Sequence, residues 1–307
     1  MEEKTRYVGS VRFYKNMLLL VIALLVLTLT VVSLYYHHRY RQAIDLLEQE
    51  YNASVESILN LDSDPLAYQT LYEDFYAPQV YNATERVSGI AYLTFDGGPS
   101  ENTAAILEIL AREGVSATFF VNGNLTNDPG YDDLLRAIVA GGHTLGLGSW
   151  SNDPAAIYAS VEAYLADMST LYTYIEETTG VQPSVFRFAG GSINSYDAGI
   201  YHELLAEMVR RGFVPYDWNL SADGGAGSTR LSAEELVLHV EDALTGLDRA
   251  IVLLHDDGTH STTVEALPGI IALLKERAFS VSALTPTAEN HFSTSLPGGN
   301  HNEQASQ

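Results

Sequence analysis

The chain of 307 residues contains no cysteine, so it can form neither a disulfide bond nor a zinc site with thiolate ligands. Basic residues are also few: 16 Lys and Arg stand against 39 Asp and Glu, which gives a formal net charge of -23. Such a surface repels a polyphosphate backbone, which argues against nucleic acid as a partner. The lack of cysteine does not fix the cellular compartment, because secreted proteins can lack it too.

One long uncharged run, MLLLVIALLVLTLTVVSLYY, extends from Met17 to Tyr36. As a helix rising about 1.5 Å per residue it reaches about 30 Å, enough to cross a bilayer. A cleaved signal peptide is the first alternative, but the run is long and no small-residue cleavage site follows it. A buried core helix is the second, and nothing polar marks an outer face. We therefore expect one transmembrane helix over residues 17–36.

Basic residues are more frequent before this run than after it. Those before it are Lys4, Arg6, Arg12 and Lys15, and those after it are Arg39 and Arg41. The positive-inside rule then predicts a cytoplasmic N-terminus over residues 1–16. The chain is accordingly expected to be a single-pass cell-membrane protein with its C-terminal domain outside the cytoplasm.

Residues 37–86 are predicted to connect this span to the main domain. Apolar residues recur at steps of three and four from Ile44 to Leu59, which indicates an amphipathic stalk helix. From Asp62 to Arg86 the chain is rich in Tyr and contains prolines, so we expect a linker or a flap against the next domain. At the other end, residues 287–307 have too few apolar side chains to fold and are predicted to be disordered.

Residues 87–286 alternate between short β-rich runs and helical stretches, a pattern that requires a parallel sheet with crossover helices. The strands are predicted at Val87–Phe95, Ser116–Val121, His143–Leu147, Val185–Phe188, Phe213–Trp218, Ala250–His255 and Phe279–Leu284. Helices are predicted at Glu101–Arg112, Asp132–Ala140, Pro154–Thr179, Tyr196–Arg211, Ala233–Thr245 and Thr262–Arg277. Seven such units favour an α/β barrel over an open sheet.

The carboxyl ends of these strands carry polar residues that a barrel brings to one mouth. They are Asp96, Gly148 to Asn152, Arg187, Asp217 with Trp218, and His255 with Asp256. Arg187 is expected to pair bidentately with Asp96, and Asp217 to hold the imidazole of His255 in one tautomer. A base and an acid would then face each other, as hydrolysis of an amide or ester requires.

Six segments, in this order, resemble the polysaccharide deacetylases with the NodB homology domain, carbohydrate esterase family four. They are YLTFDGGPSENTAAILEIL, ATFFVNG, GGHTLGLGSWSNDPAAIYASVEAYL, FRFAGGSIN, YDWNLSADGG and IVLLHDDGTHSTTVEALPGIIALL. The resemblance spans about Val87 to Leu284. It implies a distorted (β/α)7 barrel and an enzyme that removes acetyl groups from N-acetylated sugars of peptidoglycan or chitin. It also implies a divalent metal, commonly zinc, that polarises the acetyl carbonyl and activates water.

The resemblance assigns roles to individual residues of this chain. Asp96 matches the general base, Arg187 the arginine that orients it, and His255 the general acid. Asp217 is similar to the acid that tunes this histidine. Trp218 and Leu253 are similar to the apolar walls around the acetyl methyl group.

The three metal-ligand positions of the family pattern are degenerate in this chain. They hold Gly97, Gly148 and Asn152, where the resemblance implies an aspartate and two histidines, and Ala189 replaces a family proline. Glycine offers no donor, and a neutral amide is a poor zinc ligand. Metal-bound water has a pKa near 7 against about 15.7 for free water, whereas general-base catalysis gives only about 10² to 10⁴-fold. We expect metal-dependent deacetylation to be impaired and no metal cofactor to be needed.

Two features leave alternatives open. A substitute metal site has candidate donors in Asp96, His143, His255, Asp256, Asp257 and His260, although His143 starts its strand and is expected to be a packed or surface histidine. The loop containing Asp256, Asp257, Thr259 and His260 is either a solvated loop or a contact for substrate or metal.

Three functions fit these patterns. The first is a membrane-tethered pseudoenzyme that binds an N-acetylated cell-wall glycan through hydrogen bonds and an aromatic face. The second is an active carbohydrate N-deacetylase or esterase with a rearranged site. The third is a scaffold ectodomain whose stalk or Tyr-rich linker recruits a protein.

Overall fold

The computed structural model describes residues 13–22, 28, 65–79, 87–128, 130–192, 194, 196, 199–222 and 231–288. The chain divides into two compact units, Met1–Glu56 and Ser57–Gln307. In the first unit, residues 13–22 form a helix whose apolar side chains from Met17 to Ile22 are exposed. No helix in the described part of the chain is long and apolar enough to cross a bilayer. The rest of the predicted span and the predicted stalk helix lie outside the described residues, so both remain predictions.

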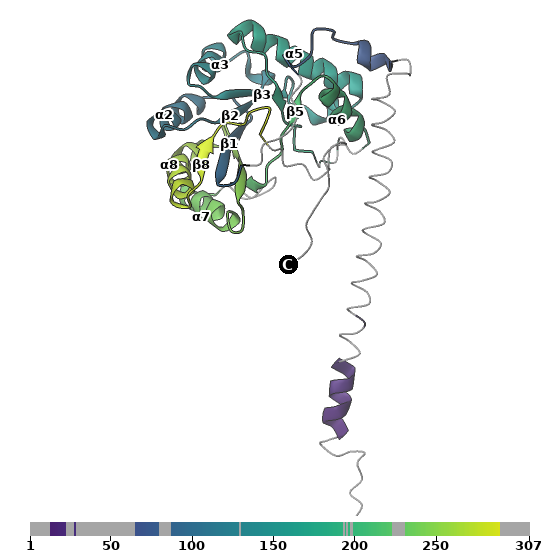
Figure 1. Cartoon of the computed structure of the whole chain (residues 1–307), viewed down its shortest axis with the longest axis vertical. Coiled ribbons are helices and arrows are strands. Elements are labelled where there is room, and N and C mark those ends of the chain that lie inside the picture. Colours follow the sequence, from purple (N-terminus) through teal and green to yellow (C-terminus); the bar gives the residue numbers. More distant parts are fainter. Residues whose placement is uncertain are drawn as a thin grey trace, which may run out of the picture. The chain divides into compact units, whose positions relative to one another are not determined.

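The second unit is built on one curled sheet of eight parallel strands (Figure 1). The strands run in the order β5 (Val214–Pro215), β4 (Val185–Phe186), β3 (Thr144–Ser149), β2 (Thr118–Asn122), β1 (Ile90–Asp96), β7 (Arg249–His255) and β6 (Leu220–Ser221), with β8 (Ser280–Ser282) also paired to β1. Asp96 at the end of β1 pairs in register with His255 of β7 and Phe120 of β2. Parallel pairing therefore brings the carboxyl ends of these strands to one edge of the sheet.

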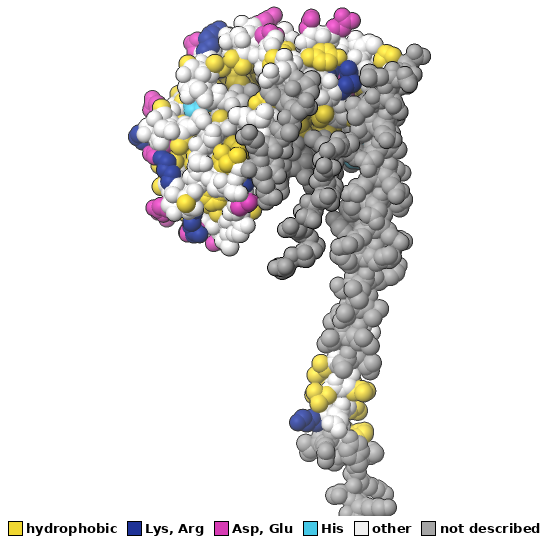
Figure 2. Space-filling view, in the orientation of Figure 1, with side chains coloured by type: hydrophobic (Ala, Val, Ile, Leu, Met, Phe, Trp, Pro, Cys, Tyr) yellow, Lys and Arg dark blue, Asp and Glu magenta, His cyan; other side chains and the backbone are white. Residues whose placement is uncertain are grey.

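Helices cover the outside of this sheet in Figure 1. They are α2 (Thr103–Glu113), α3 (Tyr131–Ala140), α4 (Pro154–Ile157), α5 (Val161–Thr179), α6 (Tyr201–Arg210), α7 (Ala233–Ala243) and α8 (Ser261–Glu276), with short 3-10 helices η1 (Ala67–Thr70) and η2 (Gly123–Leu125). Helices cover the outside of the sheet and core side chains fill its inside, so β1 and β7 are buried along five consecutive central residues, as parallel strands are. Acidic side chains are spread among these helices over the face seen in Figure 2.

The parallel α/β architecture is the predicted one, but its strand count and closure differ from the prediction. The described residues form eight strands instead of the predicted seven, because Leu220–Ser221 is too short to give a recognisable alternation in sequence. Within the described residues, β5 and β6 form the two ends of the strand order and do not pair with each other. The sheet is therefore a curled half-barrel.

The single helix predicted over Pro154–Thr179 is wrong, because the chain forms two helices, α4 and α5. Asp153 caps the first, its side chain accepting hydrogen bonds from backbone N–H groups at the start of α4. Ser160 caps the second in the same way, accepting from the N–H of Ala163 at 3.2 Å. An N-cap residue has extended backbone angles, so a cap at Ser160 interrupts a continuous helix.

Two predicted boundaries also move. Helix α6 begins at Tyr201, five residues after the predicted start at Tyr196. Ala288, the last described residue, is buried in the core, although the disordered tail is predicted to begin at Thr287. The hydroxyl of Tyr216 donates to the carbonyls of Thr285 at 2.8 Å and Ala288 at 2.5 Å, which fixes this end.

The core on the inner face of the sheet determines where the site residues stand. One cluster of buried side chains contains Tyr92, Phe120, Val185, Tyr216, Ile251, Leu284 and Ala288. Side chains two or four residues apart on a strand share a face. Asp96 follows Tyr92 by four residues, Arg187 follows Val185 by two, and His255 follows Ile251 by four. The same inner face thus changes from apolar to polar at the carboxyl ends.

Residues 65–79 pack on the domain as the predicted flap. Phe75 is 2% exposed, and its ring lies 4.7 Å from that of Phe213 and 5.4 Å from that of Tyr172. The guanidinium of Arg211 donates to four carbonyls of this segment, while Glu207, itself fully buried, accepts from Arg211 at 2.7 Å. This buried ion pair therefore attaches the segment to the end of α6.

Candidate functional site

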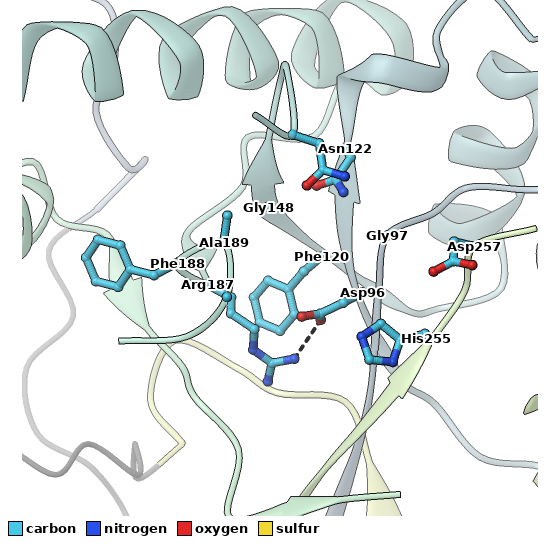
Figure 3. A pocket seen from close by; sticks show the side chains of 12 residues that line it. Asp96, Gly97, Phe120, Asn122, Gly148, Arg187, Phe188, Ala189, His255 and Asp257 are labelled. Carbon is cyan, nitrogen blue, oxygen red and sulfur yellow. Dashed lines mark hydrogen bonds and ion pairs between the residues drawn. The ribbon is translucent and has the colours of Figure 1, made fainter. Parts of the chain in front are cut away.

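A cavity of about 220 Å³ opens at the carboxyl edge of the sheet (Figure 3). It is lined by Asp96, Gly97, Phe120, Asn122, Gly148, Asn152, Arg187, Phe188, Ala189, Gly190, His255 and Asp257. These residues come from β1, β2, β3, β4, β7 and the segments that follow them. The six residues Asp96, Gly97, Gly148, Asn152, Arg187 and His255 line one cavity, as expected from their places at the strand ends. That Gly97, Gly148 and Asn152 stand at the family's metal-ligand positions stays a prediction.

Arg187 forms the floor of the cavity, and its side chain is only 1% exposed. Its guanidinium lies 4.2 Å from the ring centroid of Phe120 and 5.4 Å from that of Trp218, within the range of cation–π contacts. Its N–H groups donate to the Asp96 carboxylate at 2.7 Å, the Thr94 hydroxyl at 2.9 Å, and the carbonyls of Tyr216 at 2.8 Å and Asp217 at 3.3 Å. With these acceptors engaged, Arg187 is a fixed positioning group.

Asp96 is oriented by this arginine, but the predicted bidentate pairing is wrong. Only Nη1 of Arg187 bonds the carboxylate, at Oδ1, because its remaining donors are directed to Thr94 and to backbone carbonyls. The Asp96 side chain is 25% exposed, so the carboxylate meets the cavity while its partner is buried. Asp96 can accept a hydrogen bond or a proton from a ligand there.

Asp217 lies next to this centre, and its carboxylate accepts hydrogen bonds from the backbone N–H and the hydroxyl of Ser192. Burial raises the pKa of Asp217, while the Ser192 hydrogen bonds and the charge of Arg187 oppose that rise. The role of Asp217 in orienting His255 stays a prediction. The cavity-lining residues include neither Asp217 nor the predicted apolar walls, Trp218 and Leu253; Trp218 packs on the core, and Leu253 is 3% exposed within β7.

The segment after β3, which carries Gly148 and Asn152, is held by Asp167 of α5. Its carboxylate accepts from the hydroxyl of Ser149 at 2.8 Å and from the N–H groups of Trp150 and Ser151 at 2.7 and 2.8 Å. Sequence patterns did not identify Asp167, because an acid inside a helix usually faces solvent. The segment is therefore a fixed wall of the cavity.

Gly97, Gly148 and Asn152 do not fit a metal ion. Gly97 has φ +91°, a left-handed conformation that residues with a side chain rarely adopt. A Cβ on Gly148 would lie 2.5 Å from Asn122 Oδ1 and 2.7 Å from the backbone carbonyl of Val121, so a side chain there requires backbone movement. Asn152 supplies only a neutral amide. In the described part of the chain, no group of three or more His, Asp or Glu residues is arranged to hold a metal.

The loop between β7 and α8 divides into a buried part and a part that faces the cavity. Asp256 is fully buried, which corrects the expectation of a solvated residue there, and it accepts hydrogen bonds from Thr103 at 2.6 Å and Ser100 at 3.3 Å. Asp257 lines the cavity, and both of its carboxylate oxygens lie 2.8 Å from Nδ1 of His260. Asp256 therefore anchors the loop, and Asp257 is available to a ligand.

His143 is a packed histidine, as predicted. It is buried at the amino end of β3, where Nδ1 accepts from the N–H of Ala117 at 3.2 Å. Its ring packs edge-on against Phe119 with centroids 5.7 Å apart, and burial lowers its pKa. The carboxyl edge that holds the cavity is at the opposite end of this strand.

Two polar residues of the cavity, Asn122 and Asp257, were given no single role by the sequence. Asn122 follows the inward-facing Phe120 by two residues, and its Oδ1 accepts from the N–H of Ser149 at 3.0 Å. The alternation of side chains along a strand predicts that Asn122 shares the inner face with Phe120. Asn at the end of a strand, however, usually indicates a turn. Asp257 was expected either as a possible metal donor or as part of a loop that is solvated or contacts a ligand, because spacing alone does not show which of two adjacent aspartates faces inward.

The arrangement combines a carboxylate, an imidazole and neutral amides around a small polar cavity. Asp96 can act as a base or an acceptor, His255 as an acid or a donor, and Asn122 and Asn152 as uncharged hydrogen-bonding groups. The described residues offer no donor set for a metal. Proton transfer between such groups alone contributes only about 10² to 10⁴-fold. Recognition of a small, neutral or cationic polar group is the chemistry that these residues support directly.

Comparisons with known proteins agree with this architecture. The family model for polysaccharide deacetylase matches residues 84–209. The chain is 31% identical over 219 residues to a peptidoglycan-N-acetylglucosamine deacetylase of Bacillus cereus, covering 70% of this chain and 75% of that protein.

Solved structures show the same likeness. The catalytic domain of a peptidoglycan N-acetylglucosamine deacetylase from Eubacterium rectale is 30% identical, with a TM-score of 0.64, over 70% of this chain and 98% of that one. A polysaccharide deacetylase from Bacillus cereus is 27% identical, with a TM-score of 0.57, over 69% of this chain and 98% of that one. The chain therefore belongs to the polysaccharide deacetylase family, carbohydrate esterase family four, with its NodB homology domain.

Proposed function

We propose that this protein binds an N-acetylated cell-wall glycan in the cavity of Asp96 and His255 and that it does not carry out metal-dependent deacetylation. The observation that supports this most directly is the composition of the cavity itself. Asp96, Arg187 and His255 line it, but the three positions for a metal hold Gly97, Gly148 and Asn152. The Bacillus cereus relative at 31% identity and the Eubacterium rectale structure at 30% are both named as deacetylases of peptidoglycan N-acetylglucosamine, which supports that glycan class.

The backbone at the degenerate positions supports the loss of metal chemistry. An aspartate at residue 97 would have to adopt a left-handed conformation, and a histidine at residue 148 would displace Asn122 or the Val121 carbonyl. The local structure is thus adapted to the glycines. A glycan with hydroxyl and acetamide groups can instead be held by the hydrogen-bonding groups around the cavity.

The test measures metal content, acetate release and binding on the full chain purified in mild detergent. The protein is incubated with zinc and N-acetylglucosamine oligomers, with Asp96→Asn as the control. We expect no stoichiometric zinc, no acetate above the control, and saturable binding of the oligomer. Stoichiometric zinc with acetate above the control would show an active deacetylase with a rearranged site, and absence of binding would favour a scaffold ectodomain.

We further propose that the protein is anchored in the cell membrane by residues 17–36, with residues 1–16 in the cytoplasm and the family domain outside. The uncharged run and the excess of basic residues before it support this placement. Protease treatment of intact cells should remove the C-terminal domain and spare an N-terminal tag. A domain that resists protease until the cells are lysed would contradict this orientation.

A further inference from the structure

Asp257 stands beside the place where the side chain of residue 97 would be. A Cβ built on Gly97 would lie 3.4 Å from Asp257 Cβ and 3.5 Å from Asp257 Oδ2. Figure 3 shows Asp257 next to the Gly97 segment, on the same side as His255. The loop after β7 thus supplies a carboxylate to the part of the cavity in which Gly97 has no side chain.

The Asp257 carboxylate is held rigidly, and its two oxygens are used unequally. Oδ1 accepts from the N–H of Thr259 at 2.8 Å, from its hydroxyl at 2.6 Å and from Nδ1 of His260 at 2.8 Å. Oδ2 shares only the His260 donor, at 2.8 Å, and it is the oxygen that faces Gly97. Because a carboxylate can accept about four hydrogen bonds, Oδ2 has room for a donor from a ligand.

The surroundings of Asp257 keep it charged and accessible. Burial alone would raise the pKa of this carboxyl, but the hydrogen bonds from Thr259 and His260 outweigh that effect and the pKa is lowered. The Asp257 side chain is 30% exposed and that of His260 is 32% exposed. The ring of His260 also stacks on that of His255, with centroids 4.7 Å apart and planes at 23°. The Asp257–His260 pair therefore forms one wall of the cavity together with His255.

The charges around the cavity favour a cation. Asp96 and Asp257 each contribute one negative charge and Arg187 one positive charge, so the lining residues sum to -1 while His255 is neutral. Arg187 is already paired with Asp96, which leaves the charge of Asp257 balanced only when His260 is protonated. The chain as a whole, at -23, attracts cations and repels anions.

We propose that Asp257 is a specificity residue that accepts a hydrogen bond from the nitrogen of an amino sugar and prefers the free, protonated amine to the acetamide. The proposal rests on the proposed binding of cell-wall glycan by this cavity. It adds that partly deacetylated glycan is bound more tightly than the fully acetylated form. The physical reason is that a hydrogen bond between an ammonium group and a carboxylate is about twice as strong as a neutral one.

The experiment compares two oligomers on the full chain in detergent at about pH 7 and low salt: tetra-glucosamine and tetra-N-acetylglucosamine. Titrations use the wild type, Asp257→Asn, His260→Gln and the control Asp133→Asn, which removes a carboxylate from an exposed position on α3. We expect the wild type to bind the amine oligomer about tenfold more tightly. Asp257→Asn should lose that preference, whereas Asp133→Asn and His260→Gln should retain it, since Gln keeps a donor without carrying charge.

The outcomes distinguish the proposed binding of glycan by the cavity from the proposed role of Asp257 in specificity. If the wild type binds neither oligomer, the proposed glycan function fails and this inference fails with it. If it binds glycan but Asp257→Asn keeps the same ratio of affinities, or the acetylated oligomer is preferred, only the role of Asp257 is overturned. If Asp257→Asn does not fold, titrations of the wild type at low and high salt test the proposal instead. The preference of the wild type for the amine oligomer should fall steeply at high salt, because salt screens the charge interaction. A ratio of the two affinities that does not change with salt would overturn the proposal.

Discussion

Asp256 should make the stability of the domain fall as pH rises from about 4 to about 7. Its side chain is fully buried beneath the cavity loop, held by the hydroxyls of Thr103 and Ser100. Burial raises the pKa of Asp256 from 3.8 to about 7, although the two hydroxyl hydrogen bonds oppose the shift. The folded protein therefore holds a proton on this group at pH values where the unfolded chain has released it.

The sign and size follow from linkage between protonation and folding. Below about pH 4 both states are protonated, so the full stabilising contribution of Asp256 is present. Between about pH 4 and about pH 7 the unfolded chain releases the proton first, and this contribution is lost progressively as pH rises. A pKa difference of about three corresponds to about 4 kcal/mol of unfolding free energy over the whole range.

Denaturant unfolding of wild type and Asp256→Asn between about pH 5 and pH 8 tests this. Both tryptophans of the chain, Trp150 and Trp218, belong to the Ser57–Gln307 unit, so fluorescence of the full chain reports its unfolding. The unfolding free energy of the variant minus that of wild type should rise by about 3 kcal/mol over this range, because Asn does not titrate. A difference that stays flat within about 0.5 kcal/mol would refute the raised pKa, and Asp133→Asn serves as an exposed control.

Two further predictions concern close packing and a buried charge. Gly148→Ala should lower the unfolding free energy by about 1 to 3 kcal/mol, because its Cβ would lie 2.7 Å from the Val121 carbonyl; unchanged denaturant unfolding would show that the segment moves freely. Arg211→Met should lower the unfolding free energy by about 1 to 3 kcal/mol, because the carbonyls of residues 65–79 that it binds lose their donor, while Arg210 still pairs with buried Glu207 at 2.7 Å. The same variant should expose residues 65–79 to limited proteolysis. Unchanged resistance of residues 65–79 to protease in Arg211→Met would contradict the role of this guanidinium in holding the segment.

Most of the fold was predictable because it depends on patterns of many residues. The apolar runs that became β1 and β7 and the period of the helices that became α2 and α8 identify their elements within a few residues. The parts that were missed depend on single hydrogen bonds or very short pairings. Ser160 ends one helix by capping the next, and β6 has only two residues, so neither leaves a periodic signal in the sequence.

The sequence predicted which residues lie in the site, but not which hydrogen bonds they form there. Asp96, Arg187 and His255 were expected at one edge because each ends a parallel strand, and that convergence is observed. The single hydrogen bond between Arg187 and Asp96 was not foreseen, because it depends on backbone carbonyls competing for the same guanidinium. Likewise, only the structure distinguishes buried Asp256 from Asp257 in the cavity.

The presence of Asp96 does not by itself indicate catalysis. Arg187 is almost fully buried, and removing one partner of a buried charge pair typically costs about 3 to 5 kcal/mol. Asp96 is therefore needed for stability whether or not the cavity binds anything. No such requirement applies to Asp257, whose side chain is 30% exposed at the cavity wall and whose Oδ2 faces Gly97. Variants of exposed Asp257 therefore distinguish a ligand-binding cavity from a pure scaffold, whereas variants of the buried Arg187–Asp96 pair do not.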